Sequence, residues 1–304
     1  MDLLLHLKSF VRVAELGGFS AAARALNTSQ PAISRQVADL EARIGARLLQ
    51  RSSSGVALTE EGHVFLDSAR VALAAADATL ASVGARLGEI TGTVRLGLSV
   101  AFGRLHVVPL LAPLLARYPG LSIELLMTDE RRDLVQDGVD ATIRIGEVTD
   151  PEVVSRRIGM TRRSLVATPD YLSRAGVPRH PRELAQHECV LFSLLVAGAD
   201  WPFLGPEGAF TQRVTGRFRA NSSEAAREAV LAGIGLNLAP LWLFGPELRD
   251  GRVVPVLPDW APTPLPINVV FPTRRQVPVR VRTVVEHLAD AFRHNPLLGE
   301  ADLS

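Results

Sequence analysis

The chain has 304 residues, of which 47% are hydrophobic and 21% are charged. These fractions are ordinary for a globular protein and exclude a disordered, collagen-like or fibrous chain. The length favours about two domains and allows a large core without disulfides or metals. The formal net charge of +1 excludes a uniformly basic coat for nucleic acid, but it does not exclude a local basic patch.

Three features bear on the compartment. The chain has one cysteine, Cys189, so no intramolecular disulfide is possible and we expect a cytoplasmic location. Polar residues interrupt the first apolar residues, so no signal peptide is predicted. The uncharged stretch 229–246 is as long as a membrane span, but glycine and proline divide it, and we interpret it as buried helix, strand and turn.

Charge is uneven along the chain. Residues 1–58 carry seven Lys/Arg and four Asp/Glu, whereas residues 59–92 carry two and five. The chain therefore begins with a small basic head, which is a weak indication of a polyanionic partner. A surplus of this size also arises by chance.

The head is predicted to contain three short helices. The first spans 3–16, because its apolar residues recur at steps of three and four, and Gly17-Gly18 ends it. The second spans 21–26, with Ser20 as its cap. The third begins at a cap formed by Thr28 or Ser29 and runs to about Ile44.

The third helix has two different faces. Its core stripe is expected to contain Ile33, Val37, Leu40 and Ile44. The opposite face presents residues that can bond to base edges or phosphates, which predicts the second helix of a helix-turn-helix: Gln30, Pro31, Ser34, Arg35 and Ala38. An ordinary solvated helix face explains this pattern equally well.

A hairpin is predicted after the third helix. Residues 47–51 and 56–59 form its strands and residues 52–55 its turn. A hairpin in this place is a wing, and Arg51 near its tip would enter an adjacent minor groove. The alternative is a surface arginine on a hairpin.

Residues 60–87 are predicted to form one long helix of about 42 Å. Thr59 is its expected cap. Its apolar residues repeat close to a heptad pattern, which favours pairing with the same helix of a second chain: Phe65, Ala69, Ala72, Ala76, Leu80, Val83 and Leu87. Burial against the downstream domain of a monomer is the alternative.

The body, residues 93–304, alternates strands and helices and predicts two α/β lobes. Strands are expected at 94–99, 121–127 and 139–145, with helices at 103–117 and 130–136 between them, in a parallel sheet. Further strands are expected at 164–167, 190–192, 214–218, 236–238, 253–256 and 267–271. A helix capped by Ser222 or Ser223 is expected to reach Leu231, and another spans 279–294. Chain crossings near 160–165 and 262–268 separate lobe I (93–162 and 267–304) from lobe II (163–266).

Ligands of open α/β sheets bind beyond the carboxyl ends of strands, beside helix N-termini. That rule predicts an effector site built from Ser99, Arg104, Thr128, Arg144, Gly146, Asn221 and Pro240, with Asp129 and Ser222-Ser223 adjacent. Two arginines beside helix N-termini favour a small carboxylate. A surface or inter-lobe ion pair is an equally good explanation for either arginine.

Signals for catalysis, cofactors and metals are weak. We find no P-loop, dinucleotide fingerprint or nucleophile elbow, and the seven histidines lack zinc-type spacing. His187 and Cys189 lie two residues apart, but a surface histidine and a buried cysteine on a strand explain them better. We therefore expect neither an enzyme nor a resident cofactor or metal.

The sequence resembles the LysR-type transcriptional regulators. In the head the resemblance rests on Phe10, Val13, Ala14, Gly18–Ala23, Leu26–Val37, Leu40, Glu41, Gly45, Leu48, Leu49, Arg51 and Leu58–Gly62. In the body, which is similar to type 2 periplasmic binding proteins, it rests on Phe102–Arg104, Pro109, Tyr118, Pro119, Asp133–Val135 and Asp140–Gly146. It covers nearly the whole chain.

The resemblance implies the following organisation. Residues 1–59 form a winged helix-turn-helix domain, 60–92 a linker and dimerisation helix with a hinge, and 93–304 an effector-binding domain. Ser29, Gln30, Pro31, Ser34 and Arg35 would lie in the major groove of double-stranded DNA, with Arg51 on the wing. The long helix would form a homodimer, and dimers would join into a homotetramer. Family members often carry Thr and a second Arg where this chain has Ser52–Ser54.

Two hypotheses follow. In the first, the chain is a DNA-binding transcriptional regulator that responds to a small-molecule effector in the inter-lobe cleft. In the second, it is a cytoplasmic small-molecule binding protein or enzyme whose head serves only in assembly. The exposed face of the third helix distinguishes them, because an assembly head tolerates any change there.

Overall fold

The structure is a computed structural model, and it describes residues 2–52, 55–86, 90–130, 138–150, 153–194, 198–272 and 277–299. The chain divides into two compact units, the N-terminal unit (1–92 with 135–138) and the C-terminal unit (93–134 with 139–304).

The N-terminal unit contains four helices and one hairpin among its described residues: α1 (Leu3–Leu16), α2 (Phe19–Ala25), α3 (Gln30–Ile44), β1 (Leu49–Ser52), β2 (Gly55–Leu58) and α4 (Glu60–Arg86). Gly17 ends α1 in the left-handed conformation, with φ of 66°. The predicted extent of the first helix and the Ser29 cap of the third are confirmed. The second helix was predicted to start too late, because Gly18 rather than Ser20 precedes its first residue.

The core of this unit joins all of its helices. Phe10 and Ile33 are fully buried between α1 and α3, and Leu40 is almost so. Phe65 of α4 lies against the ring of Phe10, with ring centroids 5.5 Å apart, and Ala69 is buried beside it. Phe65 and Ala69, the first residues of the predicted heptad seam, are therefore covered within their own unit. The sequence pattern alone could not distinguish this packing from pairing between two chains.

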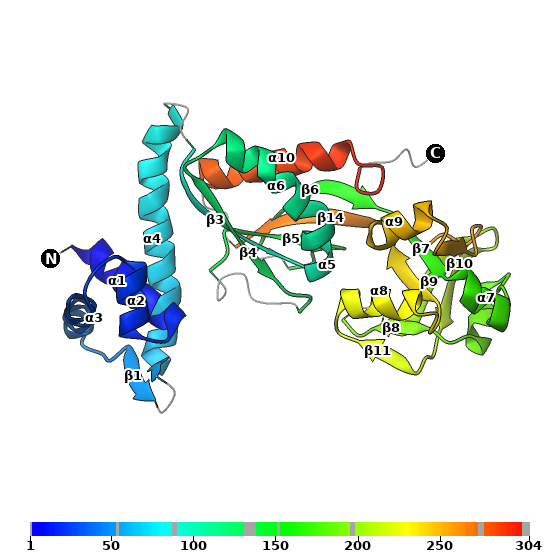
Figure 1. The fold of residues 1–304 in the computed structure, drawn as a ribbon, viewed down its shortest axis with the longest axis horizontal. Helices are drawn as coiled ribbons and strands as arrows, with labels where there is room; N and C mark the ends of the chain where they lie inside the picture. Colours follow the sequence, from blue (N-terminus) through cyan, green and yellow to red (C-terminus); the bar gives the residue numbers. More distant parts are fainter. Residues whose placement is uncertain are drawn as a thin grey trace. The chain divides into compact units, whose positions relative to one another are not determined.

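In the first lobe of the C-terminal unit, one sheet has the strand order β4-β3-β5-β14-β6. Its elements are β3 (Gly92–Leu98), β4 (Leu121–Met127), β5 (Ala141–Ile145), β6 (Val154–Thr161) and β14 (Leu265–Phe271), with helices α5 (Val100–Phe102), α6 (Val108–Arg117) and α10 (Val279–Arg293). Helices α6 and α10 lie side by side over the sheet (Figure 1).

The predicted parallel arrangement is confirmed for β3 and β5, but the sheet as a whole is mixed. Strand β3 runs parallel to β5, but β14 is antiparallel to both β5 and β6. The reason is topological: β14 returns from the second lobe and inserts between β5 and β6. The helix expected at 130–136 lies almost entirely outside the described residues.

The second lobe, from β7 to β13, holds smaller sheets. They are formed by β7 (Arg163–Ala167), β8 (Val190–Phe192), β9 (Asp200–Gly205), β10 (Gly208–Arg213), β11 (Phe218–Ala220), β12 (Asn237–Pro240) and β13 (Val254–Val256), with helices α7 (Pro169–Ala175), α8 (Ser223–Leu231) and α9 (Gly245–Arg249). The strand expected at 214–218 begins only at Phe218, and the β9–β10 hairpin was not predicted.

Two apolar stretches raise the question of a membrane helix. The stretch 229–246 forms the end of α8, β12, a 3-10 turn and the start of α9, which confirms its prediction as helix, strand and turn. Among the described residues, the helical run Val100–Arg117 is long and apolar enough to cross a membrane. Its Phe102 is buried against the rings of Trp242 and Phe292, as expected for a core helix.

Candidate DNA interface and inter-lobe site

The start of α3 is fixed by its own sequence. The Ser29 side chain accepts a hydrogen bond from the Ala32 amide at 3.3 Å, and Pro31 in the first turn has no N–H to leave unsatisfied. All five predicted DNA-contacting residues of this helix are exposed: Ser29, Gln30, Pro31, Ser34 and Arg35. The structure therefore presents them together on the surface.

The opposite face of α3 anchors it. Ile33, Val37 and Leu40 are each 3% exposed or less, whereas Ile44, which was also expected in this stripe, is 39% exposed at the end of the helix. The buried Ser9 hydroxyl on α1 donates to the Gln36 side-chain oxygen at 2.5 Å. Sequence reasoning did not single out this bond, which ties α3 to α1.

The hairpin is tied to the end of α3 by one carboxylate. Glu41, which is 8% exposed, accepts from the backbone amides of Leu48 at 2.8 Å and Leu49 at 3.1 Å. The backbone of Arg51 pairs with Val56 in the hairpin, and its side chain lies outside the described part. The predicted strand at 47–51 begins two residues later than expected because Arg47 and Leu48 lie in this connection.

Five of the seven predicted effector residues lie at strand ends in the C-terminal unit. Ser99 follows β3, Thr128 follows β4 and Gly146 follows β5, while Asn221 follows β11 and Pro240 ends β12. The first three belong to the first lobe and the other two to the second. Their location agrees with the strand-end rule, and their role in effector binding stays a prediction.

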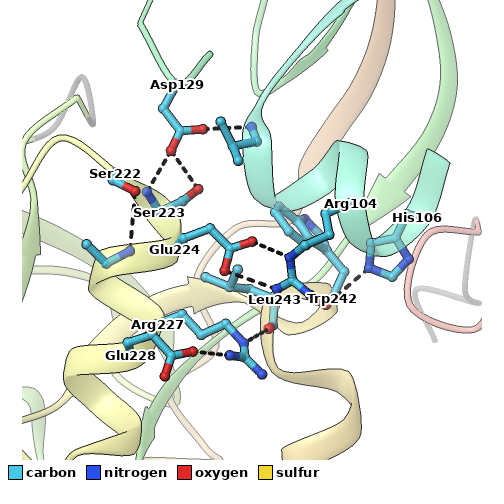
Figure 2. Close-up of polar contacts among 12 residues, drawn as sticks. Arg104, His106, Asp129, Ser222, Ser223, Glu224, Arg227, Glu228, Trp242 and Leu243 are labelled. Atoms are coloured by element: carbon cyan, nitrogen blue, oxygen red, sulfur yellow. Dashed lines mark hydrogen bonds and ion pairs between the residues drawn. The ribbon is translucent and has the colours of Figure 1, made fainter. Parts of the chain in front are cut away.

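One aspartate bridges the two lobes at this point (Figure 2). Asp129 accepts from the Val100 amide at 3.2 Å through one carboxylate oxygen. Its other oxygen accepts from the Ser223 amide at 2.7 Å and from the Ser223 hydroxyl at 2.8 Å. Because Val100 and Ser223 begin α5 and α8, the carboxylate lies between two helix N-termini, where negative charge is stabilised.

A bidentate ion pair lies beside it. Arg104 donates through Nε to one Glu224 oxygen at 2.8 Å and through a terminal nitrogen to the other at 3.0 Å. This hydrogen bond raises the pKa of Arg104. The pair is an inter-lobe ion pair, which is the alternative that the sequence left open for Arg104. Glu224 was not singled out, although an acidic residue just after the α8 cap is a recognisable signal.

His106 also joins the two lobes, and it is less exposed than Arg104. Its Nε2 lies 3.1 Å from the Trp242 carbonyl oxygen, and its ring packs edge-on against the Trp242 ring. Burial lowers the pKa of His106, although the carbonyl opposes the shift. Arg104 and His106 both project from a π-helical turn, Gly103–Val107, a feature that occurs often at functional sites.

Arg144 and Gly146 belong to the first lobe. Arg144 pairs with Asn268 across β5 and β14, and the Gly146 carbonyl accepts from the Asn268 side chain at 2.9 Å. Their neighbours in the sheet therefore hold the backbone of this strand end in place.

Cys189 and His187, the pair considered for metal binding or catalysis, have surroundings that fit a structural role. Cys189 is 1% exposed, and burial raises its pKa to about 12, so the thiol stays protonated. The His187 ring bonds to the Tyr171 hydroxyl at 3.2 Å rather than to the thiol. Within the described ranges, no group of three or more His, Cys, Asp or Glu side chains is arranged to hold a metal ion.

Comparison with known proteins matches both units. Residues 4–63 match the bacterial regulatory helix-turn-helix proteins of the lysR family, and residues 87–293 match the LysR substrate binding domain. The chain is 31% identical over 301 residues to an HTH-type transcriptional repressor of Pseudomonas aeruginosa, covering 97% of this chain and 94% of that protein. It is 31% identical over 293 residues to the transcriptional activator AaeR of Escherichia coli, covering 96% and 94%. The structure of CrgA, a LysR-type regulator from Neisseria meningitidis, superposes with a TM-score of 0.62 at 28% identity, covering 94% and 97%.

The chain belongs to the LysR family of bacterial transcriptional regulators. It is a DNA-binding regulator with an effector-binding domain, its partners are DNA and a small molecule, and it is not an enzyme. The family consists of soluble, generally cytoplasmic regulators. This decides between the two hypotheses in favour of the regulator.

Proposed function

We propose that the chain reads its promoter with the exposed face of α3. Gln30 would bond to adenine, Arg35 to guanine, and Ser29 and Ser34 to bases or phosphates beside Pro31. Arg51 on the hairpin would enter the neighbouring minor groove. The observation that supports this most is the division of α3 into a buried stripe and an exposed polar face.

We infer that the effector is a small carboxylate that binds between the lobes. Arg104 already holds one carboxylate, that of Glu224, in a bidentate pair that is half exposed on the arginine side. A free carboxylate offers the same two acceptor oxygens and can replace Glu224. Ser99, Thr128, Arg144, Gly146, Asn221 and Pro240 complete the proposed site.

We also propose a role for each segment of the chain, an oligomeric state and a cellular location. Residues 1–59 would bind DNA, 60–92 would pair two chains into a homodimer that joins into a homotetramer, and 93–304 would bind the effector. Val64 and Val71 of α4 are exposed, which supports a second copy as partner for this helix. The protein would act in the cytoplasm.

A footprint on the DNA upstream of the chain's own gene tests the regulator proposal. Purified full-length protein should protect a discrete segment, and sodium benzoate or succinate should change its extent, whereas neutral benzamide should not. Protection of no genomic fragment in preference to scrambled duplex, with every carboxylate supplied, contradicts the proposal.

Matched variants test the effector site separately. Glu224→Gln should lower the carboxylate concentration that gives half the effect, because it removes the internal competitor. Arg104→Gln should abolish the carboxylate effect and leave DNA protection intact. Unchanged responses in both variants place the effector elsewhere.

A further inference from the structure

The residues after α10 form a fixed turn. The Asn295 side-chain oxygen accepts from the Leu297 amide at 2.9 Å. The Asn295 carbonyl accepts from the amides of Leu298 at 3.0 Å and Gly299 at 2.8 Å. Leu298 is fully buried. We call residues 295–299 the C-terminal turn.

The turn contacts the first lobe at an unpaired sheet edge. Strand β6 is the last strand of its sheet, so one of its edges has no neighbouring strand. The Met160 amide on β6 donates to the Leu298 carbonyl at 2.9 Å. A Cβ at Gly159 would lie 2.5 Å from that carbonyl oxygen, so only glycine leaves room for the turn.

The same turn contacts the second lobe through the preceding residue. Gly245 is buried at the start of α9, and a Cβ there would lie 2.8 Å from Cδ1 of Leu297. The turn lies beside α9 in Figure 1, where it is drawn in red after α10. Leu298 therefore contacts the first lobe at Gly159, and Leu297 contacts the second lobe at Gly245.

The contact lies where the chain passes between the lobes. Strand β6 ends at Thr161 and β7 begins at Arg163, with Arg162 between them. The Arg163 side chain donates to the Thr263 carbonyl at 3.0 Å and so ties this crossing to the returning one. The turn lies outside the match to the LysR substrate binding domain, which ends at residue 293.

From these contacts we propose that the C-terminal turn is a brace between the lobes. It fixes the second lobe against the edge of the first at the crossing, and any change of the angle between the lobes must shift or release it. The brace is independent of the effector's identity, because it lies at β6 and α9 and uses none of the proposed effector residues.

Trypsin cleavage at Arg162 and Arg163 measures the brace directly. The comparison uses the full chain, a variant that ends at Gly299 and a variant that ends at His294. Cleavage of a folded protein follows the population of the locally opened state. The variant ending at His294 should be cut at the crossing roughly ten-fold faster, while the variant ending at Gly299 should match the full chain.

If the variant ending at His294 does not fold, a single substitution tests the same contact. Leu297→Asp removes the contact with Gly245 and leaves the Leu298 carbonyl available, so it should also speed cleavage at the crossing. Leu115→Asp, at an exposed leucine on α6, is the control and should not. Unchanged cleavage in Leu297→Asp, or equal acceleration at Arg117 far from the crossing, overturns the proposal.

Discussion

Removing the Glu41 carboxylate should free the hairpin from the end of α3. In Glu41→Ala the buried amides of Leu48 and Leu49 lose their acceptor, since the carboxylate bonds to both at 2.8 and 3.1 Å. An unsatisfied buried donor costs about 1–3 kcal/mol, so the two together cost about 2–6 kcal/mol. The hairpin that carries Arg51 should then open locally more often than in the wild type.

Amide hydrogen exchange measures this opening. A loss of at least 2 kcal/mol should accelerate exchange at Leu48 and Leu49 by roughly thirty-fold or more. Asp39→Ala is the matched control, because Asp39 lies on the same helix with a side chain that is 52% exposed. Exchange at the two amides that stays at the wild-type rate in Glu41→Ala would refute the role assigned to this carboxylate.

Three further predictions follow from single side chains. Ser29→Ala should destabilise the start of α3 by about 1 kcal/mol, seen as faster amide exchange at Ala32, with Ser34→Ala as control. Because burial holds the pKa of His106 below 6.5, the unfolded chain binds a proton there first as the pH falls. The urea concentration at which half of the C-terminal unit is unfolded should therefore decrease as the pH falls below 6.5. The decrease should be smaller in His106→Gln, and an equal decrease in both proteins contradicts this prediction. Cys189, with a pKa of about 12, should not react with Ellman's reagent at pH 8 until the unit unfolds. Immediate reaction of the native protein would contradict its burial.

Local sequence signals predicted the N-terminal unit well. Helix periodicity, the Ser29 cap and the Gly17 end define α1 and α3, because each depends on residues that are close in sequence. The position of the strand ends was predictable for the same reason, so Ser99 and Thr128 lie where the strand-end rule expects.

The contacts between distant segments were not predictable in this way. The strand-end rule placed Asp129 and Ser223 in one site, and it left an inter-lobe ion pair open for Arg104. The individual bonds, such as that from Arg104 to Glu224, depend on how the chain crosses twice between the lobes. The antiparallel insertion of β14 depends on the same return crossing, and no periodicity within the strand encodes it. The burial of Phe65 and Ala69 likewise depends on α1 packing against α4.

The most direct test of the central claim is a competition gel shift with Arg35→Ala at several salt concentrations. The specific site from the footprint competes against scrambled duplex, and Arg43→Ala, about two turns further along the exposed side of α3, is the control. Arg35→Ala should lose about 1–3 kcal/mol on the specific site and little on scrambled duplex, whereas Arg43→Ala should not lose specificity. An equal loss on both duplexes for Arg35→Ala would contradict base reading by this face of α3.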